Sequence, residues 1–357
     1  MTASRETLLA ALDAHVDPLL GQGLVSAGVV KSLQPGNRPL VEIELGFPAA
    51  GIRESFCQAV AQALRQSCGV EAEVRLSWRI QSQALRRNLQ PLPEIRNIIA
   101  VASGKGGVGK STVAANLALA LRLEGARVGL LDADIYGPSQ PRMLGVEGQR
   151  PTSPDGRRMH PIEALGLQVM SIGFLIDDDQ PMIWRGPMAT QALNQLIGET
   201  AWQDLDYLVI DLPPGTGDIQ LTLSQKIPLS GAVIVTTPQD IALLDARKGL
   251  QMFRKVEVPV LGIVENMAIY CCPNCGHSEH IFGAGGGEKL ARDYDTELLG
   301  SLPLSAKIRA QADGGRPTVI AEPDSAEAQS YRAIARIAAA RLAHGAVQTS
   351  FPSIEIA

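Results

Sequence analysis

Short, continuous apolar runs separated by longer amphipathic stretches recur along the chain from Asn97 onward. Such runs are typical of parallel strands that are buried on both faces, and the stretches between them are long enough for crossover helices. The pattern predicts strands at 98–102, 128–131, 167–172, 207–211, 232–236, 260–264 and near 298–301. These strands predict an α/β fold with an open, doubly wound and mostly parallel sheet, which binds ligands at the carboxyl ends of its strands.

The pattern before residue 80 is different. Residues 41–45 and 72–76 alternate between apolar and polar, as half-buried strands do, and residues 28–33 form an apolar run. With a helical stretch from Glu6 and an amphipathic helix at 53–66, residues 1–80 are predicted to form a small α+β domain. Residues 81–96, rich in Gln, Arg and Pro, are predicted to be a linker, and residues 97–357 a second domain.

Composition narrows the class of function. The net charge of −5 offers no basic surplus for a phosphate backbone or an anionic membrane, so neither nucleic acid nor a membrane is expected as a partner. No apolar run approaches the roughly 20 residues of a membrane span, which favours a cytoplasmic protein. Five cysteines, an odd number, do not suggest a secreted disulfide framework, and a metal or redox role fits them better.

A glycine-rich loop, 104–111, follows the first predicted strand of the large domain. Its glycines let backbone N–H groups turn towards an anion, and the helix that starts at its end adds a partial positive charge. Lys110 is expected to reach the β- and γ-phosphates of ATP, and the Ser111 hydroxyl to bind Mg²⁺. A flexible glycine-rich turn with a solvated lysine is the alternative. The residues that match the G-x-x-x-x-G-K-[ST] pattern, with the following threonine, are Gly104, Lys105, Gly106, Gly107, Val108, Gly109, Lys110, Ser111 and Thr112.

Acidic residues stand at the ends of two further predicted strands. Asp132 and Asp134 follow the second strand, and Asp211 ends the fourth. Carboxylates at these positions can approach Mg²⁺ and an attacking water from the side opposite the loop. Asp211 is predicted to hold Mg²⁺ through water, and Gly215 to present its N–H to the γ-phosphate. The alternative is that such carboxylates cap helices at strand exits.

A cysteine pair, Cys272 and Cys275, has the two-residue spacing of a metal knuckle. One pair is half of the four ligands that a tetrahedral zinc or a [4Fe–4S] cluster needs, and the nearby His277 and His280 lie too close to Cys275 for a zinc finger. The simplest completion is a homodimer in which each copy donates one pair. Cys271 is a competing partner for Cys275, although the C-x-x-C register favours Cys272. A redox-inert pair in a surface turn is the alternative.

The second lysine of the loop, Lys105, resembles the signature lysine of the deviant Walker-A group, which includes septum-site and plasmid-partition ATPases. The resemblance implies that this lysine reaches the partner subunit's phosphates in a dimer. A solvated Lys105 is the alternative.

The combination of the loop, 132–139, 211–218 and 266–270 leading into the cysteine pair resembles the Mrp/ApbC-type iron–sulfur cluster carrier ATPases. The resemblance implies slow ATP hydrolysis and a homodimer that takes a labile [4Fe–4S] cluster from cluster donors and passes it to apo client proteins. It also implies that Asp134 orients the hydrolytic water and Asp132 supports the metal shell, and that Asn266 and Pro303 contact the adenine. Residues 17–20 and 25–30 resemble the iron–sulfur assembly domain of such proteins, but no cysteine stands at 46–51.

Two other functions compete. A partition- or septum-type positioning ATPase needs a basic or amphipathic face, which the C-terminal stretch 331–346 does not offer. The other is a zinc-stabilised dimeric nucleotide switch. Reconstitution with iron and sulfide, together with an analysis of bound zinc, distinguishes these functions from that of a cluster carrier.

Overall fold

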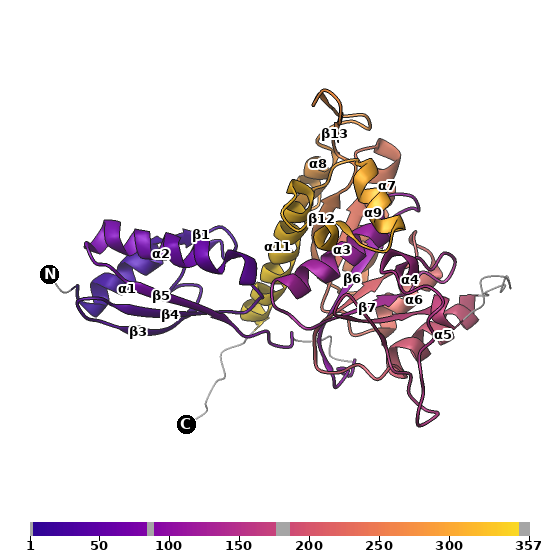
Figure 1. Ribbon diagram of the computed structural model, residues 1–357, viewed down its shortest axis with the longest axis horizontal. Helices are drawn as coiled ribbons and strands as arrows, with labels where there is room; N and C mark the ends of the chain where they lie inside the picture. The colour runs from indigo at the N-terminus through magenta and orange to yellow at the C-terminus, as the bar shows by residue number, and fades with distance from the viewer. Residues whose placement is uncertain (1–2, 84–88, 176–185, 350–357) are drawn as a thin grey trace. The chain divides into compact units, whose positions relative to one another are not determined.

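The chain folds into two compact units, each with its own sheet (Figure 1). The computed structural model describes residues 3–83, 89–175 and 186–349. The N-terminal unit takes its residues from 1–81, 123–125 and 339–357, and the large unit from 82–122 and 126–338.

The N-terminal unit is built on a three-stranded sheet. Strand β3 (Val30–Gln34) pairs antiparallel with β4 (Leu40–Leu45), and β4 pairs parallel with β5 (Glu73–Trp78). Every second residue of β4 is buried, beginning with Val41, and helix α2 (Arg53–Cys68) packs on β5 and on α1 (Arg5–Ala14). A small ladder joins β1 (Val16–Asp17) to β2 (Gln22–Gly23). The predicted α+β fold of this region is therefore confirmed.

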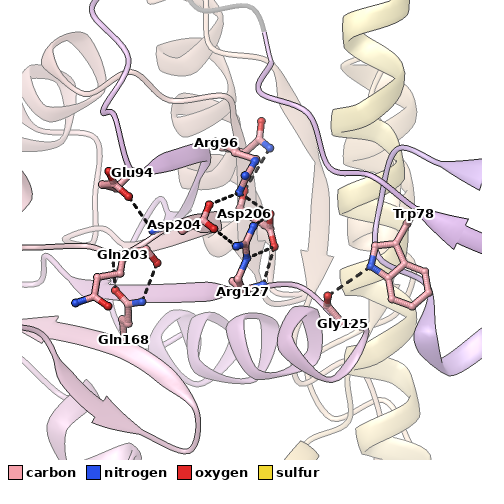
Figure 2. A network of polar contacts seen from close by, with 10 residues as sticks. Trp78, Glu94, Arg96, Gly125, Arg127, Gln168, Gln203, Asp204 and Asp206 are labelled. Carbon is pink, nitrogen blue, oxygen red and sulfur yellow. Dashed lines mark hydrogen bonds and ion pairs between the residues drawn. The ribbon is translucent and has the colours of Figure 1, made fainter.

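Residues 123–125, which are the last residue of α3 (Lys110–Leu123) and the turn after it, belong to the N-terminal unit. Glu124 is fully buried there: its carboxylate accepts a hydrogen bond from the Gly51 N–H at 2.8 Å, and its carbonyl accepts one from the Ala50 N–H at 3.0 Å. The Trp78 indole N–H donates to the Gly125 carbonyl at 3.4 Å (Figure 2). The Gly51 contact gives the buried Glu124 carboxylate a hydrogen-bond partner, without which its burial would be costly.

The large unit contains an eight-stranded sheet in the order β15-β12-β11-β6-β10-β7-β9-β8. All pairs are parallel except the one between β8 and β9. The predicted α/β fold and its seven strands are confirmed, and β8 is an additional antiparallel edge strand. The strands are β6 (Ile95–Ser103), β7 (Val128–Asp132), β8 (Ile162–Ala164), β9 (Leu167–Ser171), β10 (Leu205–Asp211), β11 (Gly231–Thr236), β12 (Val260–Glu265) and β15 (Leu298–Ser301).

Helices flank this sheet and exclude water from its central strands. Helix α7 packs on β6, β11 and β12, and α8 on β12 and β15. Ile99, Leu130 and Val209 are fully buried, as continuous apolar runs require. No helix among the described residues has the length and apolar character to cross a membrane. The helices are α3 (Lys110–Leu123), α4 (Gln140–Met143), α5 (Gly186–Gly198), α6 (Asp218–Lys226), α7 (Asp240–Lys255), α8 (Gly286–Asp293), α9 (Ala306–Asp313), α10 (Thr318–Ala321) and α11 (Ala326–Thr349).

The strand order places a topological switch at β6. The chain passes from β6 to β7, returns to fill the gap with β10, and then builds the other half of the sheet from β11. A loop that follows β6 therefore opens at the point where the two halves diverge, which is where open α/β sheets bind ligands.

The amino ends of β6, β7 and β10 are joined by an ionic network (Figure 2). The Asp206 carboxylate accepts hydrogen bonds from Arg96 Nη1 at 2.9 Å and from Arg127 Nη2 at 3.1 Å. Asp204 pairs with the same two arginines. Nearby, the Gln168 amide forms two hydrogen bonds with the Gln203 backbone, at 2.9 and 3.0 Å. We call the four charged residues Arg96, Arg127, Asp204 and Asp206 the amino-end network.

Candidate functional site

The glycine-rich loop runs from the end of β6 to the first residue of α3, Lys110. Two of its glycines are required by close approach. A Cβ on Gly104 would lie 2.2 Å from the carbonyl carbon of Asp245 in α7, and one on Gly109 would lie 2.2 Å from Nδ2 of Asn266. Gly109 also has φ +79°, which other residues rarely adopt. Gly106 and Gly107 are exposed and Val108 is buried, so one side of the loop is open to solvent.

Lys110 is the centre of a buried charge cluster. Its Nζ pairs with Asp211 Oδ1 and lies 3.5 Å from Asp134 Oδ2 and 3.3 Å from the Ser111 hydroxyl. The Lys110 and Asp211 side chains are 6% and 0% exposed. Burial alone would lower the pKa of Lys110, but the negative charge of Asp211 and its neighbours outweighs burial and raises it. The structure thus brings Lys110, Asp134 and Asp211 together in one cluster.

The two carboxylates after β7 have different surroundings. The Asp132 carboxylate accepts hydrogen bonds from the Ser139 and Gln140 N–H groups at 2.9 and 3.0 Å, and from the Ser171 hydroxyl at 3.1 Å. Burial and then the charge of Asp211 raise the pKa of Asp132 to about 7. Asp134 keeps some exposure, 12% of its side chain, and burial raises its pKa as well. Asp134 is thus the carboxylate of this pair with access to solvent.

Gln140 is a member of this cluster that the sequence did not indicate. Its side-chain amide donates to Asp211 Oδ2 at 2.9 Å and to the Ser111 carbonyl at 3.0 Å, and the residue is 0% exposed. In the sequence, Gln140 is marked by its position directly after residues 132–139. Ser171, at the end of β9, was also missed.

Gly215 and Lys105 lie at the rim of the loop. The Gly215 N–H, predicted to reach the γ-phosphate, donates to the Ser103 carbonyl at 2.9 Å. Lys105 is half-buried, with its Nζ 3.4 Å from Oε1 of Gln239, the residue before α7. Thr112 is half-buried in the first turn of α3, and its carbonyl accepts a hydrogen bond from Asn116.

Asn266 connects the loop to the next segment of the chain. Its side-chain amide donates to the Val108 carbonyl at 2.9 Å, and its backbone N–H donates to Thr236 at the end of β11. Pro303 is half-buried in a segment that runs beside residues 268–270, because the Ala268 N–H donates to Leu302 at 2.9 Å. Of the two residues predicted to contact adenine, Asn266 directly follows β12, and Pro303 lies two residues after the neighbouring strand β15.

The cysteine pair lies on a small hairpin that follows Asn266. Strands β13 (Tyr270–Cys271) and β14 (Ser278–Glu279) pair antiparallel, and Figure 1 shows this hairpin projecting beyond α7 and α8. Cys275 and Cys271 are exposed, and Cys272 is half-buried. The N–H groups of Asn274 and Cys275, and then the Cys275 thiol, lower the pKa of Cys272. The geometry thus favours the Cys272 thiolate.

A complete metal site is absent from the part of the chain that the structure describes. No three His, Cys, Asp or Glu side chains there are grouped closely enough to hold a metal ion. His280 makes a hydrogen bond within the fold: its Nδ1 lies 2.8 Å from the Ala268 carbonyl oxygen. Soft thiolates suit iron–sulfur clusters and zinc, so Cys272 and Cys275 fit either as half of a site.

Comparisons with known proteins agree with these features. A family model described as a NUBPL iron-transfer P-loop NTPase, of the ParA type, matches residues 94–339. An iron-sulfur cluster carrier protein of Pseudomonas fragi is 63% identical over 265 residues, which cover 74% of this chain and 92% of that protein. The iron-sulfur cluster transfer protein NUBPL of Mus musculus is 49% identical over 301 residues, 83% of this chain and 93% of that protein.

Solved structures show the same fold. A nucleotide-binding protein of Archaeoglobus fulgidus in complex with ADP is 41% identical, with a TM-score of 0.57 over 65% of this chain and 90% of that one. The cell division ATPase MinD of Pyrococcus furiosus, 24% identical with a TM-score of 0.51, covers 68% of this chain and 97% of its own and shares the fold. The resemblance to Mrp/ApbC-type carriers is confirmed, since the family model spans residues 94–339: this chain belongs to the NUBPL iron-transfer P-loop NTPases.

Proposed function

We propose that this protein is an ATP-hydrolysing iron–sulfur cluster carrier that binds a [4Fe–4S] cluster between two copies of itself and passes it to apo proteins. One observation carries the proposal: the Cys272–Cys275 hairpin continues directly from Asn266, whose side chain holds the phosphate loop. Relatives named as iron-sulfur cluster carriers, at up to 63% identity, support the same cargo.

The nucleotide half of the proposal rests on the charge cluster. One lysine, Lys110, is grouped with the carboxylates of Asp132, Asp134 and Asp211, which leaves a formal surplus of negative charge beside the loop. A divalent cation compensates such a surplus, so the cluster fits Mg²⁺. We assign Ser111 and Asp211 to hold Mg²⁺, which neutralises charge on the phosphates when bound.

The remaining roles follow from position. The loop N–H groups bind the phosphates, Lys110 exchanges Asp211 for phosphate oxygens, and Asp134 orients the water because it is the partly exposed carboxylate. Asp132 supports this arrangement from a fully buried position. The Gly215 N–H is released from Ser103 to sense the γ-phosphate, while Asn266 and Pro303 flank the base. Lys105 reaches the phosphates of the partner copy.

The cluster half of the proposal requires a homodimer. Each chain supplies two thiolates, Cys272 and Cys275, and a [4Fe–4S] cluster takes four. A two-fold axis through the hairpins would supply the other two. Because Asn266 binds the Val108 carbonyl of the loop and the Ala268 carbonyl anchors His280 of the hairpin, a change in the loop on nucleotide binding is transmitted to the thiolates through residues 266–272.

Anaerobic reconstitution with iron and sulfide tests the cargo. The wild-type protein is expected to gain visible absorbance and about four irons per dimer, and Cys272→Ala with Cys275→Ala is expected to gain neither while still binding ADP. The matched control is Cys57→Ala with Cys68→Ala, which removes the two half-buried thiols of the N-terminal unit. A cluster retained in full by the first variant, or a monomeric cluster-loaded protein, would refute the proposal. Zinc bound in place of iron would support a zinc-stabilised switch instead.

Transfer is tested with the reconstituted dimer. An apo enzyme that depends on a [4Fe–4S] cluster is expected to regain activity when mixed with the loaded protein, and a chelator of free iron is expected not to prevent it. Complete inhibition by the chelator would mean that iron is released into solution rather than passed between proteins.

A further inference from the structure

Gln140 is a buried neutral side chain that contacts both residues assigned to Mg²⁺. Its Nε2 donates to Asp211 Oδ2 at 2.9 Å and to the backbone carbonyl of Ser111 at 3.0 Å. Its own backbone N–H donates to Asp132 Oδ2 at 3.0 Å. A single residue thus contacts the start of α3, the end of β10 and the end of β7.

The two oxygens of Asp211 have different partners. Oδ1 pairs with Lys110, and Oδ2 accepts from Gln140. If Lys110 turns to the phosphates when nucleotide binds, Gln140 is the partner that keeps the carboxylate in place. An amide is suited to this task because it restrains the carboxylate by a hydrogen bond without neutralising the charge that attracts a divalent cation.

We propose that Gln140 is a positioning residue for Mg²⁺, which orients Asp211 and Ser111 so that the metal strengthens nucleotide binding. The inference rests on the proposed nucleotide function. Because the Gln140 amide is already held by two acceptors, it loses little entropy when the metal binds. Its removal is therefore expected to weaken Mg²⁺ binding rather than phosphate binding by the loop. The Gln140 Oε1 atom is buried with no hydrogen-bond partner among the residues described, which means that packing alone does not explain a polar side chain here.

Gln140→Met tests the assignment, because methionine keeps the length and volume and removes the amide. The affinity for a non-hydrolysable ATP analogue is measured by calorimetry, once with Mg²⁺ and once with EDTA. We expect the strengthening by Mg²⁺ to fall by about tenfold, the effect of losing one charge-assisted hydrogen bond, while the affinity in EDTA stays within about twofold of the wild type. The Mg²⁺ concentration for half-maximal ATP hydrolysis is expected to rise in parallel.

Gln168→Met is the matched control. Gln168 also forms two hydrogen bonds, but with the Gln203 backbone beside the amino-end network (Figure 2). Loss of the Gln168 amide is expected to lower the free energy of unfolding without changing how much Mg²⁺ strengthens nucleotide binding. If Gln140→Met does not fold, Gln140→Asn keeps the amide but shortens its reach, and the same loss of Mg²⁺ dependence is expected.

The outcomes separate the two claims. An unchanged ratio of affinities with Mg²⁺ and EDTA in a folded Gln140 variant, whether or not both affinities fall, would overturn the positioning role. A wild-type protein that binds the analogue no better with Mg²⁺ than with EDTA would instead overturn the proposed nucleotide site.

Discussion

The two ends of the strands β6, β7 and β10 both carry ionic networks, and the networks differ in balance. At the amino end, two arginines face two aspartates, Asp204 and Asp206, and the formal charges cancel. At the carboxyl end, Lys110 faces the three carboxylates of Asp132, Asp134 and Asp211. The same sheet therefore supports one network that is complete in itself and one that has a surplus of negative charge.

Burial sharpens the difference. Arg96 and Arg127 at the amino end are 34% and 52% exposed, whereas Lys110 and Asp211 at the carboxyl end are 6% and 0% exposed. Uncompensated charge is inexpensive in water and costly in a protein interior. A buried surplus of negative charge therefore indicates a binding site for a cation. A balanced and partly exposed network indicates a structural role. Four predictions test this contrast.

The largest effect is expected from Lys110→Ala. The variant removes the cation that balances Asp211 and binds the phosphates, so ATP hydrolysis is expected to fall by roughly 10²–10³ or more. Arg96→Ala is the counterpart at the amino end and is expected to leave hydrolysis within about twofold, since Arg96 is far along β6 from the loop. Steady-state phosphate release measures both. Comparable losses in the two variants would mean that the ends are not functionally distinct.

Much of this arrangement was predictable from sequence. Continuous apolar runs give buried parallel strands, and parallel strands bring their carboxyl ends to one edge, so the sequence could place Lys110 and Asp211 at the same edge of the sheet. The edge strand β8 was missed because its three residues are too short for a pattern. The likeness of the cysteine hairpin to a metal knuckle came from spacing alone.

The polar partners of the site were not predictable. Gln140 and Ser171 reach the carboxylates only because α4 and the end of β9 are folded against β7, and neither residue type has a local pattern that signals such a contact. The amino-end network was missed for the same reason, since Arg and Asp near strand starts usually read as solvated. Long-range packing decides which polar residues become buried partners.

The next effect is on stability. Asp206→Ala is expected to lower the free energy of unfolding of the large unit by about 2–3 kcal/mol, because the 11%-exposed carboxylate accepts hydrogen bonds from both arginines and the Arg127 N–H. Hydrogen exchange of the β10 amides in increasing urea measures the change. Affinity for ADP, followed by calorimetry, is expected to stay unchanged. A loss of nucleotide affinity without a loss of stability would contradict the structural assignment.

A smaller effect is expected from pH. Burial and the Asp211 charge raise the pKa of Asp132 to about 7, above the 3.8 of an exposed aspartate. The folded state therefore binds this proton more tightly than the unfolded chain does. Its contribution to stability is full below about 3.8 and is lost as the pH rises through about 7, with a slope of at most about 1.4 kcal/mol per pH unit.

Asp132→Asn is expected to flatten this slope in the nucleotide-free protein, because asparagine carries no proton to lose. Urea unfolding of the large unit across this pH range measures it, and Gln168→Met, which removes hydrogen bonds but no titrating group, is the control. A variant with the wild-type slope would show that Asp132 does not dominate the pH dependence.

The smallest effect is expected from Asp204→Asn. Asp204 pairs with the same two arginines as Asp206, but its side chain is 57% exposed instead of 11%. An exposed ion pair contributes about 0–1 kcal/mol and is screened by salt. Asparagine also tolerates the left-handed backbone at this position, where φ is +45°, so no strain is added. The loss of stability in urea is therefore expected to stay below about 1 kcal/mol and to vanish at high salt. A loss as large as that of the Asp206 variant would mean that charge pairing, and not burial, decides what each end of the sheet contributes.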